Sequence, residues 1–299
     1  MLAHRVLAFI LIVIGAAGAR AALADSMPFS DGVLWRVERA SGAASYVFGT
    51  LHSTDEQVTA LPQPVSDAFA ASRTLAVECI LDNPAIFKIG RAMLLPSGER
   101  LDAAMSAAQV ARLKDVSARY HLPFTMVTRF KAWGAMMLFS VPPSEHLRAA
   151  AGLKPLDEQL RAQAEAAGKT VLGLETIDEQ IDALDGMVPA DQMTMLDSTL
   201  QDAGQIERVF ASLRDAYLAR DLVAVYSLLN SEKSGEAAAT VDRFERRLIF
   251  DRNRRMVQRM DKLLRQGNAF VAVGSLHLPG VHGILQLLSD EGYQVTRVY

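Results

Sequence analysis

The same short pattern stands near both ends of the sequence: an apolar run followed by Gly, Thr or Ser, Leu and His. It reads YVFGTLH at residues 46–52 and VAVGSLH at residues 271–277. Apolar runs this short, bounded by polar and turn residues, are typical of buried strands rather than helices. If the two strands serve one purpose, both ends of the chain must lie in the same sheet, which excludes folds that keep them apart.

Further apolar runs with β-branched or aromatic residues predict more strands, several of them buried on both faces. The predicted strands cover residues 33–37, 46–48, 75–81, 170–174, 269–273 and 293–298. Apolar residues spaced three and four apart predict helices between them, at residues 63–72, 84–93, 107–119, 129–140 and 156–167. The chain is therefore expected to belong to the α/β (mixed α+β) class.

Residues 187–266 differ from the rest of the chain because they are almost unbroken Ala, Leu, Met, Arg, Glu and Gln. They predict a stack of three or four helices without a strand. No low-complexity linker divides the sequence. We therefore expect residues 25–299 to form one domain whose central sheet is built from both ends of the chain and flanked by helices. The helical insertion is expected to cap the crevice at the carboxyl ends of the strands.

The first residues have the parts of a secretory signal peptide: a short basic start, an apolar run from Val6 to about Ala19, and an Ala-Leu-Ala triplet that ends at Ala24. The alternative is an uncleaved membrane anchor, but a spanning helix needs roughly 20 apolar residues, more than this run supplies. No later segment is long and apolar enough to span a membrane. We expect residues 1–24 to be a signal peptide and the mature protein to be periplasmic or secreted, without stable membrane insertion.

The charge and the cysteine count limit the partners and the cross-links of the chain. A formal net charge of −3 gives no electrostatic reason to expect nucleic acid or anionic lipid as a partner. Cys79 is the single cysteine, so no internal disulfide can form. Because it follows an apolar run, we interpret it as a small buried hydrophobe rather than a nucleophile. The sequence does not indicate an oligomeric state.

Four of the predicted strands are followed by residues that can bind a metal or move a proton. These residues are His52, Glu78, Glu175 and His277. In an open α/β sheet, ligands bind in the crevice at the carboxyl ends of the strands, so we expect the four side chains to converge there. Gly49 and Gly274, three residues before each histidine, allow a sharp turn or the close approach of a ligand to the backbone.

Two imidazoles with one or two carboxylates suit Zn, Mn, Co or Fe and leave a position for water. A metal held in this way supplies a hydroxide nucleophile, and a carboxylate that is not a ligand can act as general base, so the pattern indicates hydrolysis. Each residue taken alone also has a structural explanation, as a hydrogen-bonded side chain at a strand end. Non-enzymatic binding of a metal, haem or small ligand needs the same residues and stays open.

Other catalytic patterns are missing from the sequence, including a Ser-centred nucleophile elbow, a phosphate-binding loop, Cys-x-x-Cys and His-Glu-x-x-His. His121 and His146 have no acidic or histidine partner at ligand spacing and are predicted to lie on the surface. His282 is either a surface residue at a helix start or a neighbour of the metal ligands.

Seven motifs occur along the chain in a specific order. They are LWRVE at 34–38, FGTLH at 48–52, LAVE at 75–78, PLDEQL at 155–160, GLETIDEQ at 173–180, the Arg-Asn pair at 252–253 and VGSLHLPG at 273–280. In this order they resemble the TraB/GumN family, and the match covers almost the whole mature chain. The family includes the Tiki proteins, metal-dependent proteases that act on Wnt ligands, and its fold is similar to that of erythromycin esterase and certain haem-uptake proteins.

The resemblance implies a divalent-metal site, with Mn or Co favoured over Zn or Fe, that uses His52, Glu78 and His277. It places Glu175 and Arg252 nearby as catalytic residues and adds three supporting residues, Asp157, Gln180 and Asn253. Structural alternatives remain, because Asp157 can cap a helix and the Arg-Asn pair can face solvent. The leading hypothesis is an exported metallohydrolase, a peptidase acting on a peptide or small-molecule substrate, with Glu175 as base or fourth ligand.

If the signal-peptide prediction holds, the exported protein lacks its first residues. Mass spectrometry of the protein recovered from the exported fraction should find a new N-terminus between residues 20 and 27, because the small residues before Asp25 form the cleavage site. An intact Met1 in that fraction would contradict the prediction.

Overall fold

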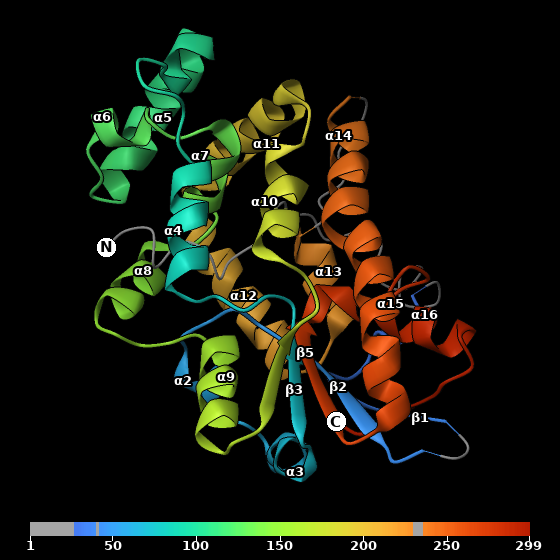
Figure 1. The fold of residues 1–299 in the computed structure, drawn as a ribbon. Helices are drawn as coiled ribbons and strands as arrows, with labels where there is room; N and C mark the ends of the chain where they lie inside the picture. The colour runs from blue at the N-terminus through green and yellow to red at the C-terminus, as the bar shows by residue number, and fades with distance from the viewer. Residues whose placement is uncertain (1–26, 40–41, 230–235) are drawn as a thin grey trace.

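The computed structural model describes residues 27–39, 42–229 and 236–299 (Figure 1). The predicted signal peptide, residues 1–24, lies outside these ranges. Across the described ranges, no helix combines the length and the apolar character that crossing a membrane requires.

A mixed six-stranded sheet forms the centre of the molecule, with the strand order β4-β3-β5-β2-β1-β6. The strands are β1 (Leu34–Glu38), β2 (Ser45–Thr50), β3 (Thr74–Val77), β4 (Thr170–Gly173), β5 (Ala269–Gly274) and β6 (Gln294–Arg297). The strands β2, β5, β3 and β4 run parallel, whereas β1 is antiparallel to both of its neighbours. The two strands that carry the repeated pattern are adjacent, so the predicted α/β class and the sheet built from both chain ends are confirmed.

Helices fill the connections between the strands. In the described residues they are α2 (Glu56–Thr59), α3 (Gln63–Ala71), α4 (Asn83–Ala92), α5 (Ala107–Arg119), α6 (Phe124–Val127), α7 (Ala132–Phe139), α8 (Pro143–Ala150), α9 (Leu156–Ala166), α10 (Ile177–Asp185), α11 (Pro189–Asp202), α12 (Ile206–Leu218), α13 (Leu222–Leu229), α14 (Glu236–Glu245), α15 (Asp251–Gln266) and α16 (Ile284–Asp290). A π turn, η3 (Arg246–Phe250), joins α14 to α15, and a 3-10 turn, η4 (Ser275–His277), follows β5.

The central strand β5 is apolar and buried along almost its whole length because helices cover both faces of the sheet. In Figure 1, α9 lies on one side of the strands and α15 on the other, where α15 contacts β1 and β5. At the middle of the sheet, the ring of Phe270 lies 5.7 Å from that of Phe48 and 5.4 Å from that of Phe69. This core ties β5 to β2 and to α3, and so fixes the strands that carry the candidate site.

A second hydrophobic core lies in the helices above the carboxyl ends of the strands. Its centre is α7, whose residues are all buried, and α7 packs along α11. A helix that is apolar on all sides has to be covered on all sides, which is why α4 and α5 join this layer. The cap is therefore built from helices before β4 as well as after it, while α15, at the end of the expected insertion, packs on the sheet.

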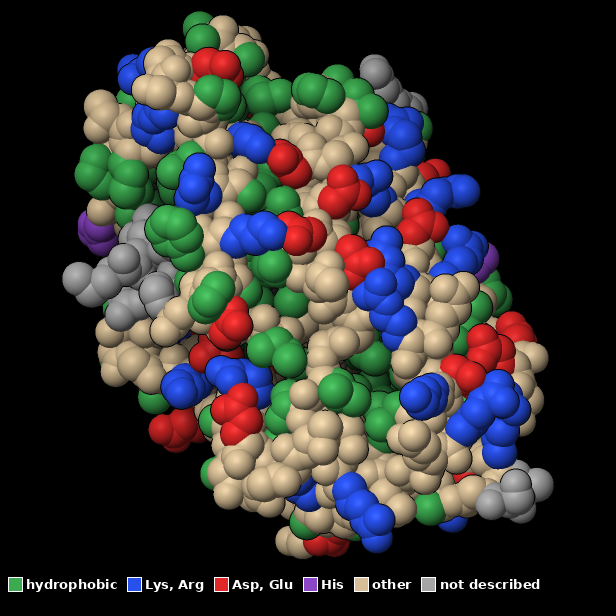
Figure 2. All heavy atoms as spheres, in the orientation of Figure 1, with side chains coloured by type: hydrophobic (Ala, Val, Ile, Leu, Met, Phe, Trp, Pro, Cys, Tyr) green, Lys and Arg blue, Asp and Glu red, His purple; other side chains and the backbone are tan. Residues whose placement is uncertain are grey.

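Ion pairs connect α10 of the cap to η3 and to α15. Arg247 and Asp182 lie 2.9 Å apart, and Arg259 and Glu179 lie 2.7 Å apart. On the face shown in Figure 2, acidic and basic side chains alternate without a large patch of one sign. Because exposed pairs contribute little individually, they orient α10 against η3 and α15 rather than hold the fold together.

Gly49 allows the two copies of the repeated pattern to touch. A Cβ atom at this position would lie 2.7 Å from Leu278 Cδ1 and 3.0 Å from Ser275 Cα, and its φ angle is not positive. The residue is therefore a glycine because of close packing against η4, not because of a turn.

We predict that Gly49→Ala lowers the free energy of unfolding by about 1–3 kcal/mol, because the added methyl group forces β2 away from η4. Urea denaturation of the purified protein measures this. Gly42→Ala is the matched control, since its Cβ would meet no atom closer than 3.9 Å. Equal stability of the two variants would show that the close contact is unimportant.

Candidate metal centre

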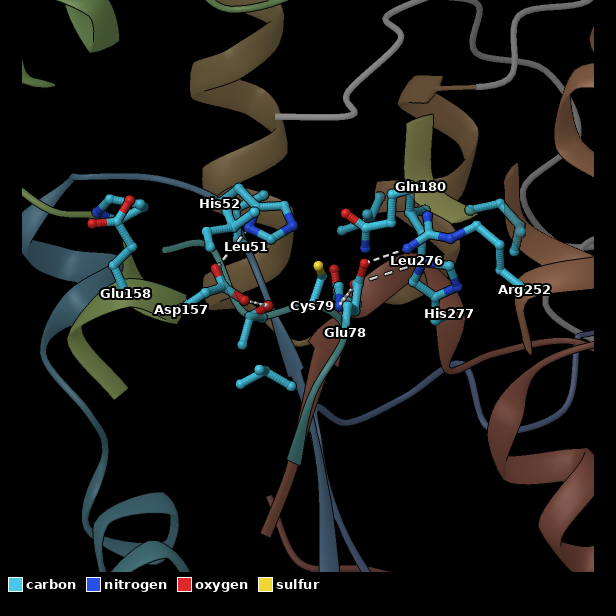
Figure 3. Close-up of a pocket in the computed structure, with 18 residues that line it drawn as sticks. Leu51, His52, Glu78, Cys79, Asp157, Glu158, Gln180, Arg252, Leu276 and His277 are labelled. Atoms are coloured by element: carbon cyan, nitrogen blue, oxygen red, sulfur yellow. Dashed lines mark hydrogen bonds and ion pairs between the residues drawn. The ribbon is translucent and has the colours of Figure 1, made fainter. Parts of the chain in front are cut away.

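A cavity of about 100 Å³ opens at the carboxyl ends of β2, β3 and β5. Most of the predicted site residues line it: His52, Glu78, Asp157, Gln180, Arg252, Gly274 and His277. Figure 3 shows His52 facing Asp157 on one side of the cavity and Glu78 near Arg252 and His277 on the other. Three predicted residues, Gly49, Glu175 and Asn253, do not line it.

Asp157, in the first turn of α9, holds the ring of His52. The His52 Nδ1 atom lies 2.7 Å from Asp157 Oδ2, and the Thr50 hydroxyl donates to Asp157 Oδ1 over 2.6 Å. Asp157 therefore does not cap α9, whose N-cap residue is Pro155. Burial disfavours the charged imidazole, but the charge and the hydrogen bond of Asp157, with the charge of Glu78, raise the pKa of His52 to about 9.

Asn253, on α15, holds the ring of His277. The Asn253 amide nitrogen donates to the backbone oxygens of His277 and His282 over 3.3 and 2.8 Å. The amide oxygen therefore faces His277 Nδ1, 2.5 Å away, and accepts the ring proton. Burial lowers the pKa of His277 to about 4, so the ring is neutral and Nε2 carries the lone pair. This Nε2 atom lies 3.7 Å from Glu78 Oε1.

Glu78 directly follows β3, and both of its oxygens accept hydrogen bonds. Oε1 accepts from the backbone N–H of Gly274 and Oε2 from Arg252 Nη2, each over 2.6 Å. Burial alone raises the pKa of this carboxyl group, but the charges of Arg252, His277 and His52 hold the pKa of Glu78 well below its usual range. Glu78 is therefore a carboxylate in spite of its burial.

Arg252 bridges Glu78 and Glu175, and it is only 2% exposed, so it does not belong to a solvated helix face. Its Nε atom donates to Glu175 Oε2 over 2.8 Å, and Arg255 donates to Glu175 Oε1 over 2.8 Å. Both oxygens of Glu175 are thus in ion pairs, outside the cavity lining. A general base or a fourth metal ligand would need an oxygen that faces the cavity, whereas Glu175 does not line it.

The absent side chain of Gly274 leaves space between the three candidate ligands. A Cβ atom built on Gly274 would lie 3.2 Å from Glu78 Oε1, 3.6 Å from His277 Cδ2 and 3.8 Å from His52 Nε2. Glycine is therefore required at this position if anything is to bind between these three side chains.

The donor set matches the chemistry of a divalent transition-metal ion, which takes imidazole nitrogen and carboxylate oxygen as ligands. Histidine ligands commonly bond their second ring nitrogen to an outer acceptor, as His52 does with Asp157 and His277 with Asn253. Within the described ranges, no three His, Cys, Asp or Glu side chains are already gathered as a complete metal-binding group. The donors face a common space at Gly274.

The other candidate residues occupy separate places. Gln180 lines the cavity, and its carboxamide makes no hydrogen bond to another described residue. Cys79 also lines it, but burial, with the charges of two nearby glutamates, raises the pKa of its thiol to about 12 and disfavours a thiolate. His121 and His282 are exposed. The prediction for His146 was wrong: the residue is half-buried, and its Nε2 donates to a backbone oxygen of α7 over 3.0 Å.

Sequence reasoning missed four residues inside the repeated pattern itself, including Ser275, which also lines the cavity. Thr50 binds Asp157, and Leu51 and Leu276 line the cavity. Each of these residues belongs to one of the two Gly-[Thr/Ser]-Leu-His copies, so the repeat itself was the signal that could have identified them. They were not predicted because their side chains are not ionisable.

The TraB/PrgY/gumN family matches residues 33–297 of the chain. The chain belongs to this family. Curated relatives include metalloprotease TIKI2 of Danio rerio, which is 28% identical over 88% of this chain and 60% of its own length. They also include the metalloprotease TIKI homolog of Nematostella vectensis, with 26% identity over 92% of this chain and 69% of its own length, and metalloprotease TIKI1 of Homo sapiens, with 26% identity over 88% and 61%. No solved structure matches.

The chain spans about 60% of the length of most of these relatives. The names of these relatives describe them as metalloproteases, which are enzymes that need a metal ion to cleave peptide bonds. In this chain, the side chains whose donor atoms suit such a metal are those of His52, Glu78 and His277.

We predict that Gly274→Ala abolishes the binding of Mn or Co, because its methyl group would occupy the space between Glu78 and the two histidines. Isothermal titration calorimetry of the metal-depleted protein measures the loss. The melting temperature without metal should stay near that of wild type, as it should for the control Gly42→Ala, whose metal affinity we expect to equal that of wild type. Unchanged affinity in Gly274→Ala would place the metal elsewhere.

Proposed function

We propose that the chain is an exported hydrolase that depends on a divalent metal ion, with Mn or Co favoured, and that it cleaves peptides. The observation that carries this proposal is the space at Gly274, which faces His52 Nε2, His277 and a carboxylate oxygen of Glu78. The names of the relatives support the peptidase assignment.

His52, Glu78 and His277 would hold the ion, and Asp157 and Asn253 orient the two rings. A bound divalent ion lowers the pKa of a coordinated water, which supplies a nucleophile at neutral pH. Glu78 stays ionised because Arg252 donates to it, and this keeps one anionic ligand in the site.

Arg252 has a second role in this proposal. Three of its nitrogens donate to Glu78, Glu175 and a backbone oxygen of η3, which uses three of its five N–H groups. Because Arg252 lines the cavity, its two remaining N–H groups would donate to a substrate carbonyl oxygen and stabilise the negative charge that develops on it. Glu175 serves this role indirectly by fixing the orientation of Arg252.

The surroundings of the cavity suit a substrate that extends beyond it. A neighbouring hollow of about 380 Å³ shares Leu81 and Glu158 with the cavity, and another of about 460 Å³ shares Cys79. A peptide can place its scissile bond at the small central cavity while its flanking residues lie in these hollows, whereas a small molecule would use only the centre.

One observation favours a second function, the non-enzymatic binding of a metal or small ligand. Three acids of the candidate site, Glu78, Asp157 and Glu175, have both oxygens in hydrogen bonds or ion pairs. General-base catalysis needs a carboxylate that can take a proton from the attacking water. Haem is disfavoured as the ligand, because about 100 Å³ is far below the roughly 300–1,000 Å³ of pockets for larger ligands.

We predict that His52→Ala and His277→Ala each abolish metal binding and peptide cleavage, and that the double variant is no worse than either single one. Residues that act as one unit are non-additive. Metal analysis of the purified protein and a peptide-library cleavage assay with Mn, Co and Zn added separately provide the measurements.

Three results of this experiment are informative. Metal binding with no turnover in any metal would favour the binding function over the hydrolase. Metal binding that survives both substitutions, with additive losses of stability, would mean that the histidines are structural. The stabilisation that added metal gives the wild type should be absent from all three variants.

A further inference from the structure

Glu145 of α8 is a fully buried carboxylate, 0% exposed, and its bonding is directed at the loop that follows His52. Its Oε1 atom accepts from the Ser53 hydroxyl over 2.9 Å and from the Arg148 guanidinium. Its Oε2 atom accepts from the Thr54 backbone N–H over 3.0 Å and from the Thr54 hydroxyl over 2.6 Å. Both oxygens are therefore fully bonded.

Burying an ionised carboxylate is costly unless charged and polar partners replace its water. Three of the four hydrogen bonds to Glu145 come from the two residues directly after His52. The same short segment is also bound to α9, since the Leu156 N–H donates to the Ser53 backbone oxygen over 3.2 Å. The loop is thus fixed between α8 and the helix that carries Asp157.

Two acids therefore hold this loop from its two ends. Asp157 binds Thr50 and the ring of His52, and Glu145 binds Ser53 and Thr54. The ring of His52 can face the space at Gly274 only while the backbone on both sides of it is fixed. Asp157 determines the ring orientation, and Glu145 determines the path of the chain immediately beyond it.

We propose that Glu145 is a positioning residue of the candidate metal centre, which acts through Ser53 and Thr54 to hold His52 in place. Its effect on metal binding rests on the proposed function, whereas its effect on the His52 ring does not. Glu145 does not line the cavity, so it is not a ligand or a catalytic group.

Asp191 provides a matched control for a merely structural role. It is also buried, at 7% exposure, and it accepts from the hydroxyl of Thr240 over 3.1 Å and from the guanidinium of Arg243 over 2.6 Å. The chemistry resembles that of Glu145, with one threonine and one arginine as partners. However, Asp191 lies on α11 and bonds α14, away from the cavity lining.

The test compares Glu145→Gln with Asp191→Asn. Both should lower the melting temperature, because each removes the charge from a buried, bonded carboxylate. Only Glu145→Gln should weaken Mn or Co binding, by about tenfold. This is the lower end of the loss in metal affinity that follows when residues that support the metal ligands are replaced. It should also shift the ring signal of His52 in carbon–proton NMR spectra of metal-free protein, assigned by its absence from His52→Ala.

The proposal is wrong if Glu145→Gln and Asp191→Asn lose similar stability while the His52 signal and the metal dissociation constant stay at wild-type values. If the wild type binds no metal, the proposed function fails, but the His52 signal still decides the role of Glu145. If Glu145→Gln does not fold, Ser53→Ala removes one donor and leaves the charge in place. That variant should shift the His52 signal in the same sense, and an unshifted signal would overturn the proposal.

Discussion

The parallel pairing of β2 with β5 is the interaction on which the candidate site depends. It brings the two ends of the chain together, with Gly49 opposite Val273 and Thr50 opposite Gly274. The pairing leaves room for η4 only because Gly49 has no side chain, and the Tyr217 hydroxyl donates to the backbone oxygen of Gly49 over 2.9 Å. A helix of the insertion therefore closes against the strand at the same residue, which links the cap to the sheet.

A second constraint is the row of buried charges behind the site. Arg252 lies between Glu78 and Glu175, and removing one partner of such a buried group typically costs about 3–5 kcal/mol because it leaves an uncompensated charge. The π turn directly before α15 helps to place this arginine. Within that turn Ile249 lines the cavity, while Leu248 is buried in the core of the cap and accepts from Arg252 through its backbone oxygen. π turns often occur at functional sites for this reason, since they change which residues face inward.

The sequence predicted the strands and their tips well because these depend on local signals. Short β-branched and aromatic runs bounded by polar residues favour strands over helices, and parallel strands place the residues that follow them at one edge of the sheet. The roles of Asp157, Glu175 and Glu145 could not be read in this way. Apart from Arg148, which is three residues from Glu145, their partners lie between 77 and 107 positions away, so the packing of α8, α9 and α15 decides what they bond. The cap built from two segments was missed because an apolar helix such as α7 does not indicate which helices cover it.

The repeated pattern does not produce two equivalent histidines. In the sheet the copies are staggered by one residue, since Gly49 faces Val273 rather than Gly274. Beyond the strands the second copy forms η4, whereas the first continues as the loop held by Glu145. The outer partners differ as well: a carboxylate raises the pKa of His52 to about 9, while His277 bonds a neutral amide and burial lowers its pKa to about 4. Each histidine of the repeated pattern thus has its own acceptor behind the ring, a carboxylate on α9 for His52 and an amide on α15 for His277.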